Sequence, residues 1–164
     1  MPAKTPSDPY TLCLKWLAAR ELSDFQIRQR LRARQVPPET INDVIAKLRS
    51  GGALDDRRTA LAFTRTDALV KRHGRTRAMR QLQSMGIDRE VARSAVREVF
   101  EDVDERTLME RALDGRIGHR GRTINNPAEY RRLFAFLVRQ GFDASAVTAL
   151  LRARARGAAR PDED

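Results

Sequence analysis

Few residues of this sequence can perform covalent or metal chemistry. Its 164 residues include one cysteine, two histidines and one tryptophan, and aromatic side chains make up 5% of the chain. A single cysteine excludes an intramolecular disulfide and indicates a reducing compartment. Two histidines and one cysteine in separate segments do not form a metal-ligand pattern, so we expect no metal and no cofactor.

Long hydrophobic runs are also absent. No apolar segment approaches the roughly 18 residues that would span a membrane, and the polar start of the chain does not resemble a signal peptide. These features predict a soluble, cytoplasmic protein.

The arrangements that activate a nucleophile or bind a nucleotide are missing as well. Cys13 stands among leucines on a predicted helix, where we expect a small buried hydrophobic residue, and only two histidines are available as bases. Gly51-Gly52 lacks the Lys-Ser/Thr that follows in a phosphate loop. Asp55 and Asp56 are better explained by helix capping than by metal binding. We therefore predict a protein that is not an enzyme.

Positive charge, in contrast, is abundant. The formal net charge is +10, and 28 of the 32 basic residues are arginines. This balance favours an anionic partner, either nucleic acid or an acidic protein surface. The preference for arginine over lysine is also what codon bias in a GC-rich genome produces, so charge alone does not identify the partner.

One helical unit occurs three times along the chain. Each copy has an amphipathic helix, a tight turn, one apolar residue directed back toward the core and then a second helix. The apolar residues are Val36, Ile87 and Phe142, at spacings of 51 and 55 residues. Self-similarity at such a period is typical of tandem helical arrays, which present extended surfaces to macromolecules. A unit of about 50 residues is marginal alone, so neighbouring copies should supply the missing burial.

Capping residues predict where the helices begin. Ser7-Asp8-Pro9 begins the first helix, Ser23 to Gln26 forms a capping box for the second, Asp88 caps the sixth and Asn126-Pro127 begins the eighth. No segment alternates apolar and polar residues for long, so no strand is predicted.

Three further expectations concern the middle of the chain. Leu61, Phe63 and Leu69 should form the apolar side of the helix that starts near Asp56. The seventh helix is predicted over 103–114. The stretch 115–125, rich in glycine and arginine, should be a flexible basic loop.

Nine predicted helices fall into three groups of three, which predicts an all-α fold of three tandem three-helix repeats. The predicted boundaries are 9–52, 53–101 and 102–156 for the repeats, with disordered ends at 1–8 and 157–164.

Arginines gather in each of the three units, most densely over 71–80, at a corner between two helices where backbone amides point outward. The planar guanidinium can pair with two oxygens of a carboxylate or phosphate. For any single arginine the alternative is a solvated surface with ion pairs between successive turns. The residues that we predict to bind a partner are Arg28, Arg32, Arg72, Arg75, Arg77, Arg80, Arg120, Arg122, Arg131 and Arg132.

No exposed aromatic series accompanies these arginines. Trp16 and Tyr10 fall on the first helix. Direct nucleic-acid binding should therefore be mostly electrostatic and sensitive to salt. The phenylalanines expected in the core are Phe63, Phe100, Phe134, Phe136 and Phe142.

Taken together, several motifs resemble the RecX regulators of the bacterial RecA recombinase. The segment 52–65, Gly-Ala-Leu-Asp-Asp followed by an Ala-x-x-Phe helix, is similar to the family's Gly-Leu-Leu-Asp-Asp segment. Gly74-x-x-Arg77 followed by Gly86-Ile87, and the closing Gly141-Phe142, match in order and spacing over roughly residues 10–155.

The sequence departs from the family pattern at four places. Thr59 stands where phenylalanine is usual, Arg57 where an acidic residue is common, and Gln140 where an arginine or lysine is usual. In the first copy, Gln35 precedes the apolar residue where the family has glycine. These departures concern a local core contact and a turn rather than the fold.

The resemblance implies an elongated, curved array that binds the groove of the RecA filament on single-stranded DNA. Such proteins block filament growth and so restrain ATP hydrolysis, strand exchange and co-protease activity. The alternative is a stand-alone basic DNA-binding protein that competes for single-stranded or duplex DNA, since three-helix units can place a helix in the major groove. An unidentified enzyme is the third possibility.

Overall fold

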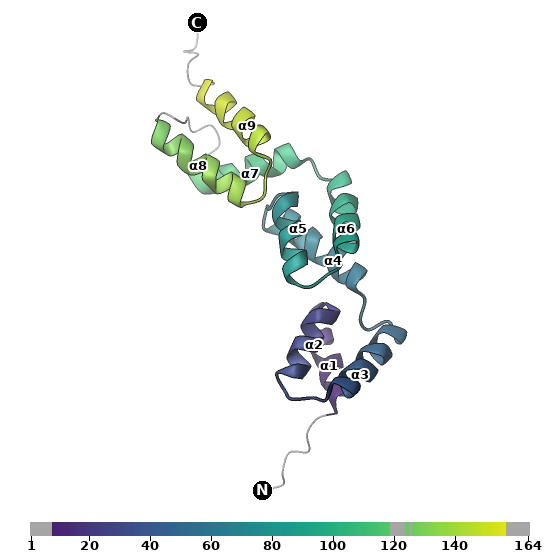
Figure 1. The fold of residues 1–164 in the computed structure, drawn as a ribbon. Coiled ribbons are helices and arrows are strands. Elements are labelled where there is room, and N and C mark those ends of the chain that lie inside the picture. The colour runs from purple at the N-terminus through teal and green to yellow at the C-terminus, as the bar shows by residue number, and fades with distance from the viewer. Residues whose placement is uncertain (1–7, 119–123, 125, 157–164) are drawn as a thin grey trace, which may run out of the picture. The chain divides into compact units, whose positions relative to one another are not determined.

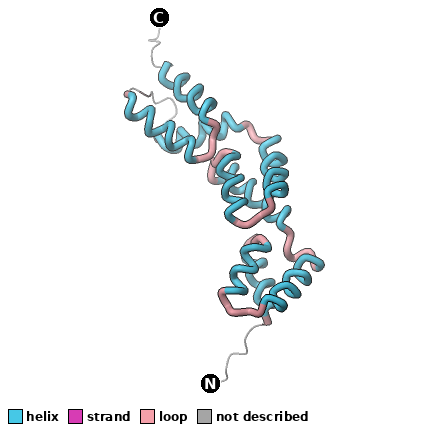
Figure 2. Tube along the Cα trace, in the orientation of Figure 1, coloured by secondary structure: helices cyan, strands magenta, loops and turns pink. Residues whose placement is uncertain are grey.

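The computed structural model describes residues 8–118, 124 and 126–156. Within these residues every regular element is a helix (Figures 1 and 2), as the sequence predicts. Apart from Asp8, the ends predicted to be disordered lie outside the described residues. The α-helices are α1 (Pro9–Ala19), α2 (Asp24–Arg32), α3 (Pro38–Ser50), α4 (Asp56–Arg65), α5 (Arg75–Ser84), α6 (Arg89–Glu101), α7 (Glu105–Ile117), α8 (Pro127–Arg139) and α9 (Ala144–Arg156), and η1 (Thr66–Val70) is a π-helical turn.

The helices form three tandem three-helix repeats, α1–α3, α4–α6 and α7–α9. The chain divides into two compact units. The first comprises Met1–Phe63 with Leu82–Ala95, and the second comprises Thr64–Gln81 with Val96–Asp164. The middle repeat therefore contributes residues to both units.

A continuous apolar core fills the first repeat. Tyr10, Trp16, Leu17 and Val36 pack against it and are partly buried. Cys13 is fully buried within it, which confirms the packing role expected for that thiol. The core residues are Cys13, Leu22, Ile27, Leu31, Ile41, Val44, Ile45, Leu48 and Leu54.

Local capping chemistry begins the helices where the sequence predicts it. Ser23 and Gln26 form the reciprocal capping box of α2. The Asp88 carboxylate accepts from the first amides of α6. Asn126 Oδ1 accepts from the amide of Glu129, 2.8 Å away, at the start of α8.

Helix α7 is longer than predicted. It begins at Glu105 and continues to Ile117, so Gly115 and Arg116 are helical and not part of a loop. The helix ends instead at Gly118, whose φ of 83° is the left-handed conformation that glycine adopts at helix C-termini. The sequence offered Gly115 as an earlier stop, but tertiary contacts of α7 outweigh the low helix propensity of one glycine.

Leu69 does not lie on the apolar side of α4, and this prediction was wrong. The helix widens to a π turn over η1, which changes the direction of the side chains that follow. Asp67 and Ala68 are buried there, whereas Leu69 is 61% exposed and Val70 is 73% exposed.

Within the first unit, the N-terminus of α2 joins the first repeat to the second. Ser23 Oγ donates to the carbonyl of Met85, in the turn between α5 and α6. The Asp24 amide donates to Asp56 Oδ1, 2.8 Å away, at the first position of α4. Gly86 lies against Phe25, and a Cβ at Gly86 would lie 2.3 Å from the Phe25 side chain. We call this set of contacts the first junction.

Within the second unit, the N-terminus of α5 makes the equivalent contacts to the third repeat. The Gly74 amide donates to the carbonyl of Gln140, 2.8 Å away, in the turn between α8 and α9. The Arg75 amide donates to Glu105 Oε1, 3.4 Å away, at the first position of α7. Gly141 lies against Arg77, and a Cβ at Gly141 would lie 2.4 Å from the Arg77 nitrogen. We call these contacts the second junction. The two junctions together explain why Gly86 follows α5 and Gly141 follows α8.

The first copy can depart from this pattern because its turn does not enter such a junction. Gln35 has a φ of 59°, so it adopts the glycine-like conformation, but its side chain is exposed. Val36 then packs against the core, half-buried. Among the described residues, close backbone approach does not require glycine at this turn.

Candidate interaction surfaces

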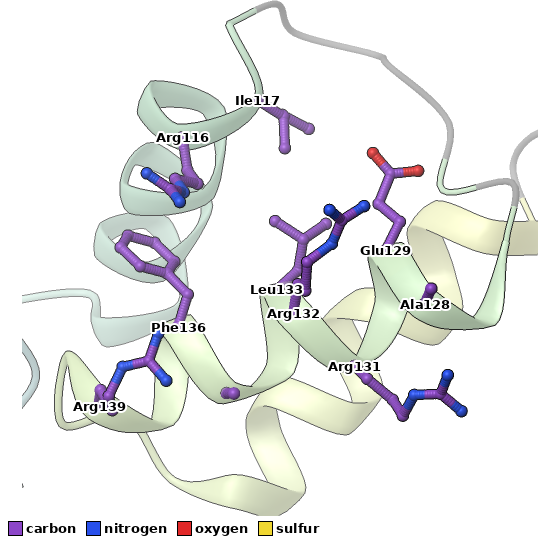
Figure 3. Close-up of a pocket in the computed structure, with 10 residues that line it drawn as sticks. Arg116, Ile117, Ala128, Glu129, Arg131, Arg132, Leu133, Phe136 and Arg139 are labelled. Atoms are coloured by element: carbon purple, nitrogen blue, oxygen red, sulfur yellow. The ribbon is translucent and has the colours of Figure 1, made fainter.

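A basic groove of about 790 Å³ lies in the third repeat, between the end of α7 and one face of α8 (Figure 3). Among the described residues, Glu129 is the one acidic residue that lines it, and Ile117 and Leu133 are among its apolar residues. We call it the α7–α8 groove. Its four cationic residues are Arg116, Arg131, Arg132 and Arg139.

Helical spacing aligns the side chains of this groove. Arg132, Phe136 and Arg139 are separated by four and three residues, so they share one face of α8. The Arg116 guanidinium from α7 lies over the Phe136 ring, 5.4 Å from its centroid, and Figure 3 shows the two side chains facing each other. This cation–π contact holds one cation at the wall of the groove.

The cations of the groove are not neutralised by neighbouring carboxylates. Among the described residues, no Asp or Glu lies within ion-pair distance of Arg116, Arg131, Arg132 or Arg139. Four guanidiniums facing one carboxylate can bind several carboxylate or phosphate groups. The groove is therefore suited to an acidic protein surface or a nucleic-acid backbone.

Two of the predicted partner-binding residues, Arg131 and Arg132, line this groove. Arg120 and Arg122 lie outside the described residues. Arg116 and Arg139 were not in the predicted set. Arg139 could have been found from its spacing of seven residues from Arg132, whereas Arg116 was assigned to a loop.

The arginines of the 71–80 segment mostly contact their own chain. Arg75 Nε donates to Glu105 Oε2 at 2.8 Å, and its guanidinium lies 5.2 Å from the centroid of the Phe100 ring. Arg77 Nη1 donates to Gln140 Oε1 at 2.9 Å. These contacts belong to the second junction, so Arg75 and Arg77 have a structural role that their sequence pattern did not reveal.

Arg72 and Arg80 differ from the other two arginines of this segment. Arg72 Nη1 lies 3.4 Å from the carbonyl of Arg111. The backbone of Arg72 has a φ of 60°. Arg80 is exposed, and no ion pair joins it to the described residues. Of the four, Arg80 is therefore the one whose charge is most available to a partner.

In the first repeat, the two predicted arginines lie four residues apart on α2 and differ in their contacts. Arg28 is held by Asp24, with 2.5 Å between Nε and Oδ1, and by Asn42, with 2.7 Å between Nη1 and Oδ1. Arg32 is exposed on the last turn of α2. Arg28 therefore has a structural role in the first repeat, and the partner-binding roles of Arg28 and Arg32 stay predictions.

A second cationic cluster, which the sequence did not indicate, surrounds Trp16. The guanidiniums of Arg30 and Arg34 lie 5.4 Å and 4.8 Å from the centroid of the indole ring. Burial, followed by repulsion from Arg20 and Arg34, lowers the pKa of Arg30 from its ordinary value. We call Arg20, Arg30, Arg34 and Trp16 the Trp16 cluster.

The phenylalanines divide into core and surface-facing residues. Phe100 and Phe142 are buried, as predicted. Phe63, Phe134 and Phe136 are only half-buried, which corrects the expectation that all five lie in the core. Phe136 is half-buried at the wall of the α7–α8 groove, whereas Leu133 and Leu137 of the same helix are buried.

Within the part of the chain that the structure describes, no group of three or more potential metal ligands occurs. A buried pair, His73 Nδ1 and Asp67 Oδ1, is 2.8 Å apart. Burial raises the pKa of the Cys13 thiol to about 11, with a smaller contribution from Asp8, so this thiol is poorly suited to act as a nucleophile. None of the described helices is long and apolar enough to cross a bilayer.

Comparisons with known proteins agree with the fold and the motifs. The family model for the first three-helix domain of RecX matches residues 10–48. The regulatory protein RecX of Amycolatopsis mediterranei (strain U-32) is 30% identical over 131 residues, which cover 80% of this chain and 74% of that protein. The regulatory protein RecX of Pelodictyon phaeoclathratiforme (strain DSM 5477 / BU-1) is 28% identical, covering 93% of this chain and 92% of that one.

Solved structures support the same fold. The crystal structure of RecX from Lactobacillus salivarius matches with a TM-score of 0.72 at 19% identity, covering 90% of this chain and 94% of that chain. A second crystal structure of a regulatory protein RecX matches with a TM-score of 0.71 at 20% identity, covering 88% of this chain and 70% of that one. On its sequence motifs, its three-helix repeats and these similarities, the chain belongs to the RecX family of regulatory proteins.

Proposed function

We propose that this protein inhibits the RecA recombinase by binding the RecA filament on single-stranded DNA and blocking filament growth. This would restrain ATP hydrolysis, strand exchange and co-protease activity. The observation that carries the proposal is the α7–α8 groove, where four arginines face one carboxylate and have no ion-pair partner among the described residues. Membership of a family of regulatory proteins supports a binding role over a catalytic one.

The groove would act by differential affinity. A ligand that binds one state of an assembly better shifts the population toward that state, by an amount set by the difference in binding free energy. A partner surface rich in carboxylates, or phosphates of the bound strand, would satisfy the uncompensated guanidiniums of the groove. Binding at the growing end of a filament would then oppose addition of the next subunit.

Among the predicted residues, Arg131 and Arg132 act in the groove under this proposal, together with Arg116 and Arg139. Arg80 is a further exposed candidate. The partner-binding roles of Arg28, Arg32, Arg72, Arg75, Arg77, Arg120 and Arg122 remain predictions.

The single-stranded-DNA-dependent ATPase of RecA tests the proposal. We expect inhibition at far less than one copy of this protein per RecA, because one bound copy can stop the growth of a whole filament. Inhibition only near the amount that saturates the DNA would instead indicate competition for the strand. That result would favour the stand-alone DNA-binding alternative.

Variants of the groove show whether its arginines are responsible. Arg132→Gln/Arg139→Gln removes two groove charges, and Arg89→Gln/Arg97→Gln removes two exposed charges from α6 as a matched control. We expect the groove variant to need at least tenfold more protein for half-inhibition, a loss of about 1.4 kcal/mol or more, and the control to change less than threefold. Equal inhibition by the two variants would exclude the groove as the site.

A further inference from the structure

The Trp16 cluster, in the first compact unit, is a second candidate binding site, separate from the α7–α8 groove. Arg30 and Arg34 lie one helical turn apart, and both guanidiniums rest near the Trp16 ring from α1. Arg20 follows directly after α1, and its backbone amide donates to the carbonyl of Trp16, 3.2 Å away. Two guanidiniums thus lie near one indole, and the Arg20 charge acts on Arg30 from the end of α1.

Their charges are not neutralised within the described chain. No carboxylate there forms an ion pair with Arg20, Arg30 or Arg34. The pKa of Arg30 is lowered by burial and then by Arg20 and Arg34, with no opposing carboxylate among the causes. The cluster therefore holds like charges close together. The negative end of α2 offsets part of this repulsion, but the cations remain free to bind an anion.

The indole also fixes the geometry of these cations. A guanidinium stacked on an aromatic face is held in one plane, and its N–H groups at the rim of that plane stay free to donate. Arg34 Nη1 additionally lies 3.4 Å from the carbonyl of Arg30. Less side-chain entropy is then lost when an anion binds, which favours binding by pre-organised donors.

From this arrangement we propose that the Trp16 cluster binds the phosphodiester backbone of a nucleic acid. A phosphodiester offers non-bridging oxygens that more than one guanidinium can share, and successive phosphates along a strand can reach Arg20, Arg30 and Arg34 in turn. A single carboxylate of a protein partner also offers two oxygens, but it supplies one anion where a strand supplies successive phosphates. Arginine beside an aromatic ring is a combination that single-strand binding proteins use.

The Trp16 cluster shares no residue with the α7–α8 groove, and the two lie in different compact units. Its test needs no RecA, so its failure and that of the proposed function can be distinguished. Because Trp16 is the only tryptophan in the chain, its fluorescence reports on this site alone. The probe is an oligothymidylate of about 12 nucleotides, within the usual range of single-strand site sizes.

Titration of the unaltered protein should change Trp16 emission to saturation. Arg30→Gln/Arg34→Gln should bind at least tenfold more weakly, with a slope of log K against log salt that is smaller by about 1.4 for two lost phosphate contacts. The control Arg89→Gln/Arg97→Gln should bind within threefold of the unaltered protein. Circular dichroism checks that each variant is folded.

A strand that binds without changing Trp16 emission would overturn the proposal, and this measurement uses the unaltered protein. It would also be overturned if poly-glutamate at equal ionic strength bound as tightly as oligothymidylate and depended on the same two arginines, because the site would then recognise acidic polypeptide. Parallel titrations with single-stranded and duplex DNA identify which form supplies the phosphodiesters.

Discussion

At the scale of single residues, Cys13 shows how burial controls reactivity. Its side chain is fully buried, and its pKa is raised to about 11, first by burial and then by Asp8, while Arg34 acts in the opposite direction. At pH 8 about one molecule in a thousand would carry the reactive thiolate. We therefore expect labelling by Ellman's reagent to be limited by opening of the first repeat. Labelling of the native protein at the rate of a free thiol would contradict this.

Asp56 is a carboxyl group whose charge costs stability. Burial is the main cause that raises its pKa, with nearby Asp24 and Asp55 adding to the rise. A raised pKa in the folded state means that this group stabilises the fold below its unfolded pKa of about 4, and that the contribution is lost as pH rises through the folded value. The carboxylate nevertheless accepts the Asp24 amide in the first junction.

Asp56→Asn keeps an oxygen acceptor for that amide and removes the charge. We expect the stability of the unaltered protein relative to this variant to fall as pH rises from 3.5 to 7, because the folded state loses the favoured neutral form of Asp56. Urea unfolding at the two pH values measures the difference. A margin that instead grows with pH would show that the Asp56 charge stabilises the fold, through Arg49 for example.

At the scale of helices and turns, local chemistry was a sufficient guide to where most helices begin. Ser23, Asp88 and Asn126 each satisfy amides within three residues of themselves, so a short sequence window contains the whole interaction. The end of α7 and the direction of Leu69 were missed because they depend on contacts and on a π turn that no short window contains.

The candidate sites likewise divide into residues that a short stretch of sequence identifies and residues whose contacts are distant in the sequence. Arg131 and Arg132 could be identified from sequence because they lie on one predicted helix start. The partners of Arg75 and Arg77 are 30 and 63 residues away, so the sequence could not show that these arginines belong to a junction. The Trp16 cluster joins α1 to the end of α2, and its existence depends on how those helices pack.

The turn that enters the first junction and the turn of the first repeat, which enters none among the described residues, predict opposite effects for glycine. Gly86→Ala should destabilise the protein by about 2 kcal/mol or more, because the added Cβ meets Phe25 and because Gly86 has a φ of 73°. Gln35→Gly should stabilise it by about 1 kcal/mol or less, because Gln35 is exposed and adopts a φ of 59°. Urea unfolding of both variants tests the pair.

The same sign for both substitutions would contradict the junction model. Destabilisation by Gln35→Gly, in particular, would mean that the Gln35 side chain makes a contact that stabilises the fold at that turn. A neutral Gly86→Ala would mean that Phe25 moves away at little cost.

At the scale of the whole molecule, the positive charge is divided between two compact units. The Trp16 cluster lies in the first unit and the α7–α8 groove in the second. Both combine arginines without ion-pair partners in the described chain with one aromatic ring. Two such surfaces on one chain suit a protein that contacts both a nucleic acid and a protein bound to it.

If this division is functional, the two surfaces should be separable by substitution. Arg30→Gln/Arg34→Gln should weaken oligothymidylate binding and retain at least half of the inhibition of RecA ATPase. Arg132→Gln/Arg139→Gln should do the reverse. Fluorescence titration and the ATPase assay on the same preparations measure both activities, and parallel loss of both by either variant would contradict separate roles.

The residues that form the two junctions have no full equivalents at the outer ends of the first and third repeats. Each junction joins the N-terminus of a second helix to the turn of the following repeat, so the linkage has a direction. At the corresponding position of the third repeat, Pro127 has no amide hydrogen, so it cannot make the contact that the Asp24 and Arg75 amides make. At the other end, the turn of the first repeat carries the side chain of Gln35 where the junction would require glycine. A further copy joined at either end would therefore lack one of the contacts that build the two junctions.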